Sequence, residues 1–447
     1  MKGLTIFFLL AIVALSLAEN PALVAVIEKP IIDKARDKYF TSVVNALGTL
    51  TLEDFKEGAI TATDIRVEIS NDASENLNVA FDNESNFIRT EIKNTNIRVK
   101  VNYKYKAVGV LPIKGTADIS GPLDSLALAI LMGKAEDGDF IIPQIAVPEV
   151  SLSMTNSKFK VKLTCKGCLK PVESLITTFM KGTLLNKVKG QVKDQVPTMA
   201  EEIGNGILTS SYPRTFPLLQ DIRIVTALTD AINVAEDHLE IPFDGTIYTA
   251  DKGIIRPGPT PDMPRYNPES PGEAQMFFSS YLTETLSNTL NTLDKLVLKT
   301  RFLLLTFVTT IDPSKGKTSV SFDDGAIVAR LNPKIVTKNL KLGFELGTSV
   351  KVSLNIKPGD SKNLLSVVPK IKKMSLNSFK VILFGLPIDL SLFKFFITPI
   401  VRLVLNFIVL PKIEIPKSDL LSLTVTDSLL AFRKEYAEFG ISFDFTQ

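Results

Sequence analysis

The chain carries the same order of sequence patterns twice, on either side of a proline-rich segment. In each half a helical pattern precedes several segments with alternating apolar and polar residues, and a second helical pattern precedes a final pair of such segments. The segment between the halves has prolines at positions 257, 259, 261, 264, 268 and 271. A stretch so rich in proline cannot join a sheet and behaves as a semi-rigid connector. We therefore expect two similar halves joined by a linker at residues 257–272.

Each half opens with a helical pattern. From Pro21 onward, apolar residues recur at the spacing of one helix face, and charged residues fall mostly elsewhere on the helix. This spacing predicts a long amphipathic helix, and a similar one is predicted from Ala274 to Leu296. Such faces ordinarily pack against a sheet, and they are also candidates for contact with lipid. The candidates are Val24, Ile27, Ile31, Ala35, Tyr39 and Val43 in the first helix, and Phe278, Leu282, Leu286, Leu290 and Leu293 in the second.

Residues 51 to 165 change to a two-residue period, which predicts antiparallel strands. Between Ile97 and Lys106 the apolar side chains share one face, and the other face carries Arg98, Lys100, Asn102, Lys104 and Lys106. A solvent-exposed polar face is usual for an antiparallel sheet, so these basic residues do not by themselves require a ligand. As an alternative, Arg98, Lys100, Lys104 and Lys106 bind anionic lipid headgroups, with about 1 kcal/mol for each basic residue near a charged surface.

A second helical pattern closes each half before two final strand-like segments. In the first half it runs from Val172 to Leu208, and in the second half it is the apolar run from Leu386 to Leu410. That run is long enough to span a bilayer, but Lys394 and Arg402 lie inside it. A charge near the centre of a spanning helix costs about 2.5–3.5 kcal/mol. We therefore predict a buried helix, with a membrane anchor as the alternative.

The composition excludes several classes of function. Because 51 basic residues are nearly matched by 48 acidic ones, for a net charge of +3, the chain does not have the charge of a nucleic-acid-binding protein. The single histidine, His238, excludes multi-histidine metal sites, and we expect it to be an ordinary loop residue. Without a nucleophile motif near it, we expect no enzymatic activity and no cofactor.

Three short motifs indicate the secretory route. Lys2, an apolar run up to Leu15 and small residues ending at Ala18 predict a signal peptide over residues 1–18. Asn83-Glu84-Ser85 is a sequon for N-glycosylation at Asn83. Cys165 and Cys168 form a C-x-x-C motif, for which we weigh a local disulfide, a redox site and a metal site. A metal site needs more ligands than these two, and we favour the disulfide in a secreted or lumenal protein.

Taken together, these features resemble the family of bactericidal/permeability-increasing protein, lipopolysaccharide-binding protein and plasma lipid-transfer proteins, within the tubular lipid-binding superfamily. The resemblance covers nearly the whole mature chain. It rests on the order of the signal peptide, the opening ALVAVIEKPIIDKA, the prolines at mid-chain and the closing FGLPIDL, IVLPK and GISFDF. The chain departs from the family at its cysteines, because the family ties a strand cysteine to one on the following helix, and this helix has none.

The resemblance implies an α+β fold. It would be an elongated boomerang of two pseudo-symmetric barrels, each a twisted antiparallel sheet wrapped on a long helix, joined by a central antiparallel sheet. The expected division is an N-terminal lipid-binding barrel at 19–220, central-sheet strands at 221–256, the linker at 257–272 and a C-terminal lipid-binding barrel at 273–447. The final strands of the chain would lie in the central sheet.

The function implied is that of a monomeric, secreted protein for lipid binding or lipid transfer. Two apolar pockets, one in each half, would hold the acyl chains of a phospholipid or glycolipid, with transient contact to membrane surfaces and none to nucleic acid. Since the chain contains no tryptophan, we expect a poorly filled apolar interior. The alternative is a host-defence protein that binds bacterial lipopolysaccharide through the basic strand faces.

Overall fold

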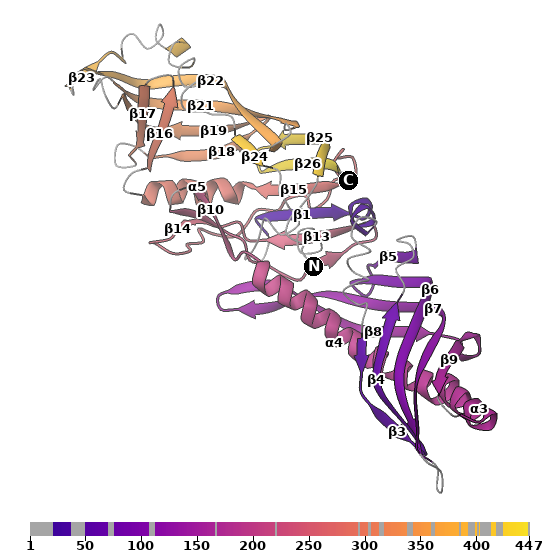
Figure 1. Ribbon diagram of the computed structural model, residues 1–447. Helices are drawn as coiled ribbons and strands as arrows, with labels where there is room; N and C mark the ends of the chain where they lie inside the picture. The colour runs from indigo at the N-terminus through magenta and orange to yellow at the C-terminus, as the bar shows by residue number, and fades with distance from the viewer. Residues whose placement is uncertain are drawn as a thin grey trace.

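The computed structural model of the protein shows an elongated molecule with a curled sheet at each end and a third sheet between them (Figure 1). The structure describes residues 21–36, 50–69, 76–106, 112–165, 168–219, 221–293, 296–302, 305–312, 317–337, 343–358, 363–383, 386–391, 398–399, 402, 413–416 and 423–445.

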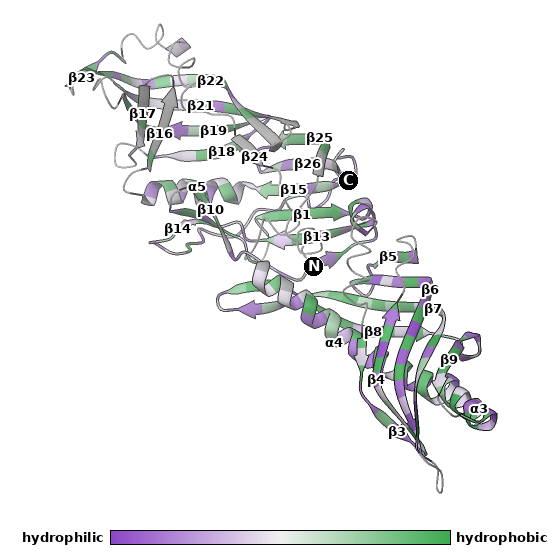
Figure 2. Ribbon diagram, in the orientation of Figure 1, coloured by the Kyte–Doolittle hydropathy of each residue, from purple (hydrophilic) through white to green (hydrophobic). Residues whose placement is uncertain are grey.

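The N-terminal sheet has eight antiparallel strands. They are β2 (Leu50–Leu52), β3 (Phe55–Glu57), β4 (Ile60–Ile69), β5 (Leu77–Asp82), β6 (Phe87–Tyr105), β7 (Ile113–Asp137), β8 (Phe140–Ser153) and β9 (Lys160–Cys165). The main order is β2-β4-β6-β7-β8, with β3 on β4, β5 on β6 and β9 on β7. Buried and exposed residues alternate along β6 as predicted, and the alternation is visible across the sheet in Figure 2.

One long helical segment packs on the concave face of this sheet (Figure 1). It consists of α3 (Lys170–Phe179), a π-helical turn at Met180–Leu184 and α4 (Leu185–Ser211). Its buried side chains, which include Ile176, Met180, Leu184, Val188 and Val192, recur every four residues and pack on the sheet. The helix predicted for Val172 to Leu208 is therefore confirmed.

Helix α4 also covers the edge of β8. The side-chain amide of Asn205 accepts from the Ile145 N–H at 2.7 Å and donates to the Ile145 carbonyl at 2.8 Å, as a neighbouring strand would. The carboxylate of Glu201 accepts from the Val147 N–H at 2.6 Å. These bonds satisfy backbone groups that an open sheet edge would leave unpaired.

The central sheet joins the halves and has internal symmetry. Its order is β12-β13-β1-β15-β26-β25. The strands are β12 (Asn233–Val234), β13 (His238–Phe243), β1 (Leu23–Glu28), β15 (Ala274–Ser279), β26 (Tyr436–Phe445) and β25 (Leu423–Phe432). Leu23 lies opposite Phe278 and Ile27 opposite Ala274, so a pseudo-twofold axis passes between Ala25 and Met276. Each half thus contributes its first strand and a later hairpin.

The predicted helix from Pro21 is wrong over its first turns, because Leu23–Glu28 forms strand β1. Five consecutive residues of β1 are buried, since the strand lies in the middle of a sheet that is covered on both faces, and helical spacing therefore carried no information there. The helix begins at Lys29, and Pro30 occupies its first turn, where a missing N–H is tolerated. Val24 and Ile27 therefore lie on a strand, and Ile31 and Ala35 on the helix.

The second predicted helix is wrong in the same way. Ala274–Ser279 is strand β15, and the helix α5 spans Ser280–Thr292. The hydroxyl of Ser279 caps α5 by accepting from the Tyr281 N–H at 3.2 Å. Phe278 therefore lies on a strand, and Leu293 follows the helix in an extended conformation.

The C-terminal sheet has nine antiparallel strands. They are β16 (Leu296–Phe302), β17 (Leu305–Ile311), β18 (Ser319–Asp323), β19 (Ala326–Leu331), β20 (Pro333–Thr337), β21 (Gly343–Pro358), β22 (Asn363–Leu383), β23 (Leu386–Asp389) and β24 (Ile413–Pro416). Helix α5 packs against β18, where the Ser287 hydroxyl accepts from the Val320 N–H at 2.8 Å. A three-stranded sheet of β10 (Thr215–Leu219), β11 (Ile222–Val225) and β14 (Ile247–Thr249) lies nearby.

The predicted buried helix at Leu386 to Leu410 is wrong at its start. Leu386–Asp389 is the exposed strand β23, paired with the end of β22. Most of the remaining run lies outside the described residues. Arg402 is described, and its guanidinium donates to the Ile371 carbonyl of β22.

The coarse fold prediction is confirmed, since antiparallel sheets dominate and a long helix lies against a curled sheet. The finer prediction of two pseudo-symmetric barrels stays a prediction.

Candidate functional site

The N-terminal sheet ends in an open cleft at its far end, where Figure 1 labels β3 and α3. The cleft has a volume of about 640 Å³, within the range of about 300–1,000 Å³ typical of small-molecule sites. Helix α3 forms one wall and the ends of β3, β4 and β6 form the other. The lining residues are Glu57, Ala59, Ile60, Tyr105, Pro171, Ser174, Leu175, Thr178 and Phe179.

The rim of the cleft is apolar on the helix side. Leu175 is 50% exposed, and Leu169, just before α3, is 72% exposed. Phe179 stacks on Phe55 with ring centroids 6.1 Å apart. Large apolar side chains in water at the mouth of a cleft are the kind of surface that marks a binding site.

Side chains fill the interior between the sheet and the helix. Val99, Ile119, Leu184 and Val188 are all fully buried in one cluster. At these side chains the helix packs closely on the sheet. The wider expectation of a poorly filled apolar interior stays a prediction.

A row of lysines crosses the outer face of the same strand ends. The strand register places Lys56 opposite Thr61, Thr61 opposite Lys104, and Lys104 opposite Lys114. Successive residues of these strands face opposite sides of the sheet. Ile60, for example, lines the cleft, and the next residue, Thr61, lies in the row of lysines. Lys106 and Lys170 lie close by, at the end of β6 and the start of α3. We call Lys56, Lys104, Lys106, Lys114 and Lys170 the tip lysines.

The tip lysines are all exposed, and within the described part of the chain none of them forms an ion pair. Residues directly opposite on neighbouring strands have Cβ atoms about 4.5–5.5 Å apart, and like charges there are destabilising. Glu57 lines the cleft, Glu173 lies on α3, and Glu53 and Asp54 precede β3. An excess of unpaired positive charge therefore surrounds the cleft.

The four predicted headgroup residues separate into two groups. Lys104 and Lys106 belong to the tip lysines. Arg98 donates to Asp118 at 2.8 Å and so lowers the pKa of that carboxyl, and Lys100 donates to Glu68 at 2.6 Å. These two cations are neutralised by neighbours on the sheet and are less available to an anion.

Those predicted lipid-contact residues that the structure describes lie away from the cleft. Ile27, Ile31 and Leu282 share a core cluster beside the central sheet, with Phe278 against it. Val24 packs on the opposite face of that sheet, under Tyr266 of the linker. Leu286, Leu290 and Leu293 pack with β11 and β14. Ala35 is buried. Tyr39 and Val43 lie outside the described residues.

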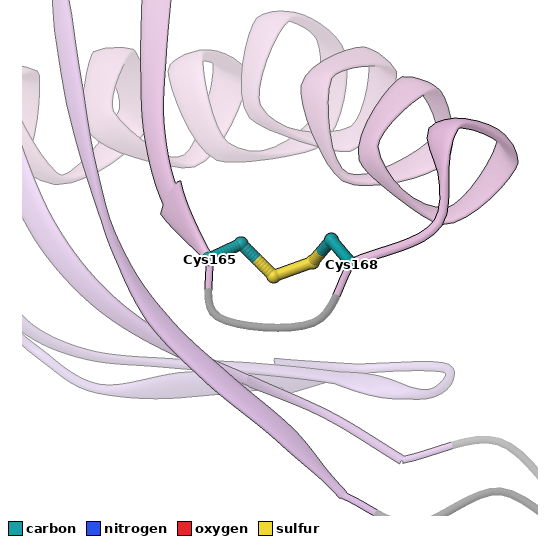
Figure 3. The surroundings of a disulfide bond; sticks show 2 residues. All are labelled: Cys165 and Cys168. Atoms are coloured by element: carbon teal, nitrogen blue, oxygen red, sulfur yellow. A yellow bond between two sulfur atoms is a disulfide. The ribbon is translucent and has the colours of Figure 1, made fainter.

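Cys165 and Cys168 form a disulfide between the end of β9 and the residues before α3 (Figure 3). Their Cα atoms are 5.7 Å apart. The bridge fixes the start of α3 beside the sheet, and with it one wall of the cleft. Sequence reasoning found the C-x-x-C motif but gave no sign that it borders a cleft.

His238 is not a loop residue as predicted, because it begins strand β13 and is only 6% exposed. Its ring stacks on Tyr266 with centroids 3.9 Å apart, and its nitrogens lie 2.6 Å from Asp237 and 3.3 Å from Glu240. Burial alone would lower the pKa of His238, but the hydrogen bonds with Glu240 and Asp237 outweigh it and raise the pKa. This histidine attaches the linker to the central sheet and is far from the cleft.

A buried carboxyl holds the other end of the linker. Asp244 is 1% exposed, and burial raises its pKa from 3.8 to about 6, against the opposing effect of its hydrogen bonds. It accepts from the Thr246 N–H at 2.7 Å and from Arg256 at 2.9 Å. Asp244 and His238 therefore have structural roles, one at each end of the linker.

Neither a metal centre nor a membrane span emerges from the described residues. No group of three or more histidine, cysteine or acidic side chains among them could hold a metal ion. Within the same part of the chain, no helix has both the length and the apolar character needed to cross a bilayer.

Neither a family model nor a curated protein sequence matches the chain. Among solved structures, a lipopolysaccharide binding protein is similar over 96% of this chain and 100% of its own, with a TM-score of 0.51 and 15% identity. Takeout 1 of Epiphyas postvittana is similar over 37% of this chain and 74% of its own, with a TM-score of 0.20 and 13% identity. The first likeness shows a shared fold, and the second is too weak to support an argument.

Proposed function

We propose that the protein binds an amphipathic, anionic lipid at the end of its N-terminal sheet. The observation that carries this is the combination of an apolar cleft with unpaired lysines around it. An acyl chain would enter between α3 and the strand ends, and the tip lysines would bind the headgroup.

The two parts of the site have separate contributions. Each methylene group removed from water contributes about 0.8 kcal/mol. Each lysine near an anionic surface contributes about 1 kcal/mol, and salt weakens this term because the lysines are exposed. Binding to the tip lysines should therefore fall with ionic strength, whereas acyl-chain burial should be much less sensitive.

The shared fold supports this proposal, since the similar structure is that of a lipopolysaccharide binding protein. We extend the proposal to a secreted, monomeric protein that carries lipid without changing it covalently. The arrangement of two barrels, with a second pocket in the C-terminal half, is part of the same proposal and rests on the family resemblance.

Mass spectrometry of lipids extracted from the purified full chain tests the proposal. We expect intact phospholipid or glycolipid to be recovered, and labelled phosphatidylglycerol to be taken up from vesicles more readily than phosphatidylcholine. Recovery of no lipid, together with no uptake of either label, would contradict lipid binding. Recovery of hydrolysed lipid would contradict binding without chemistry.

The second candidate function is recognition of bacterial lipopolysaccharide, which carries both phosphate groups and acyl chains. The lysine row favours it, because Lys56, Lys104 and Lys114 present three cations in a line across the strands. Competition by purified lipopolysaccharide against labelled phosphatidylglycerol distinguishes the two. Displacement at much lower lipopolysaccharide than phosphatidylglycerol concentration favours the host-defence function, and equal competition favours general lipid binding.

A further inference from the structure

The sequence contains one N-glycosylation sequon, and it falls on a surface turn. Asn83, Glu84 and Ser85 are all exposed in the turn that joins β5 to β6. A sequon is a weak signal alone, because a buried one cannot carry a glycan in the folded protein. The structure removes this objection, since Asn83 is exposed and lies in the turn between the two strands.

Hydrogen bonds from the residues on either side of the sequon fix the turn. Asp82 accepts from the Ser85 N–H at 3.2 Å and from Arg89 at 2.9 Å. Asn86 donates to the Ile232 carbonyl at 3.1 Å and accepts from the Val234 N–H at 2.7 Å, which docks the turn on the edge of the central sheet. Among the described contacts, none uses the side-chain amide of Asn83. A substituent there would disrupt no bond of the fold.

We propose that Asn83 carries an N-linked glycan. The co-reactant is an oligosaccharide activated on a lipid diphosphate in the secretory pathway, and oligosaccharyl transferase catalyses its transfer to Asn83. The Asn83 amide nitrogen bonds to the anomeric carbon and loses a proton, and the bond from that carbon to the diphosphate oxygen breaks. The glycan would project beside the central sheet, while the cleft lies at the far end of the N-terminal sheet (Figure 1).

Expression of the full chain in a eukaryotic secretory host tests the proposal. We expect an increase in intact mass that peptide N-glycosidase removes with conversion of Asn83 to aspartate. Asn83→Gln and Ser85→Ala should each abolish the mass increase, and Ser85→Thr, which keeps the hydroxyl, should retain it. Asn83→Gln should leave lipid uptake unchanged, because the glycan is remote from the cleft.

Two results would overturn the proposal. One is recovery of the wild-type chain without any glycan on Asn83, whether from the medium or from inside the cells. The other is a mass increase that persists in both Asn83→Gln and Ser85→Ala. Neither result bears on the cleft, whose lipid binding is measured on the same preparations.

Discussion

Lys104 of β6 and Lys114 of β7 lie directly opposite each other, and neither has an acidic partner within the described part of the chain. Two facing cations destabilise a sheet, so this pair lowers the stability of the fold at the place where the cleft opens. An anionic headgroup between them would relieve the repulsion. The pair thus links stability and binding at one site.

Lys104→Glu should raise stability and reduce binding at the same time. The new carboxylate would face Lys114 and stabilise the sheet by about 0.2–1 kcal/mol, while uptake of phosphatidylglycerol falls. Chemical denaturation and vesicle uptake measure the two effects. Lys160→Glu is the matched control, because Lys160 is an exposed lysine on β9 opposite the neutral Ser120. An equal loss of uptake in the control would assign binding to the whole basic face.

Substitutions at two adjacent residues of α3 should affect different properties, lipid uptake in one case and stability in the other. Leu175→Ser removes an exposed apolar group from the cleft, so stability should change by less than about 0.5 kcal/mol while lipid uptake falls. Ile176→Ala creates a space in the core, so stability should fall by about 2–5 kcal/mol. Unchanged uptake in the folded Leu175→Ser variant would contradict the cleft as the acyl site.

Stability should increase as the pH falls from 8 to about 5. Asp244 has a folded pKa of about 6 against 3.8, so its contribution is complete below 3.8 and is lost as the pH rises through 6. His238 also has a raised pKa, so its contribution is present below about 6.5 and is lost as the pH rises through the folded value. Both groups bind protons more tightly in the folded state and act in the same direction.

Asp244→Asn is the variant that checks the pH dependence. An uncharged amide should flatten the curve around pH 6, and each pKa unit corresponds to about 1.4 kcal/mol. Thermal unfolding of wild type and variant across this range measures the difference. A wild-type curve that falls on acidification from 8 to 5 would contradict the prediction.

Asn205→Ala should destabilise the N-terminal half by about 1–3 kcal/mol. The change removes the amide that satisfies both backbone groups of Ile145 at the edge of β8. Glu202→Ala, at an exposed position on the same helix, is the control and should have little effect. Denaturant titration measures both, and equal stabilities would show that water replaces the amide without loss.

The sequence predicted those elements whose burial follows a simple period. The alternation along β6 and the helix beginning near Lys170 were predictable because each has one dry face. Strand β1 was not, because Leu23 to Ile27 is buried on both faces and its apolar residues fit either period. Its β-branched residues, Val24, Val26 and Ile27, were the signal for a strand.

The site was harder to predict than the fold. The cleft depends on the register of β3, β4 and β6 and on the orientation of α3 relative to the sheet. Neither property can be predicted from the sequence of a single segment. Leu175 fits the apolar spacing of a core position but is half exposed. The separation of Lys104 from Lys100 also required the structure, because only cross-strand neighbours show which lysine has a carboxylate partner.

The seam between β1 and β15 joins residues about 250 positions apart, since Leu23 pairs with Phe278. Neither half can therefore complete its fold alone, because the edge of β1 or β15 that pairs with the other half would be left without a hydrogen-bonding partner. During synthesis, the opening strand must wait until more than half of the polypeptide has been made before its neighbour exists. If the two halves are expressed separately, divided at the proline-rich segment, each should aggregate through its unpaired strand edge. Co-expression of both halves should restore a soluble complex.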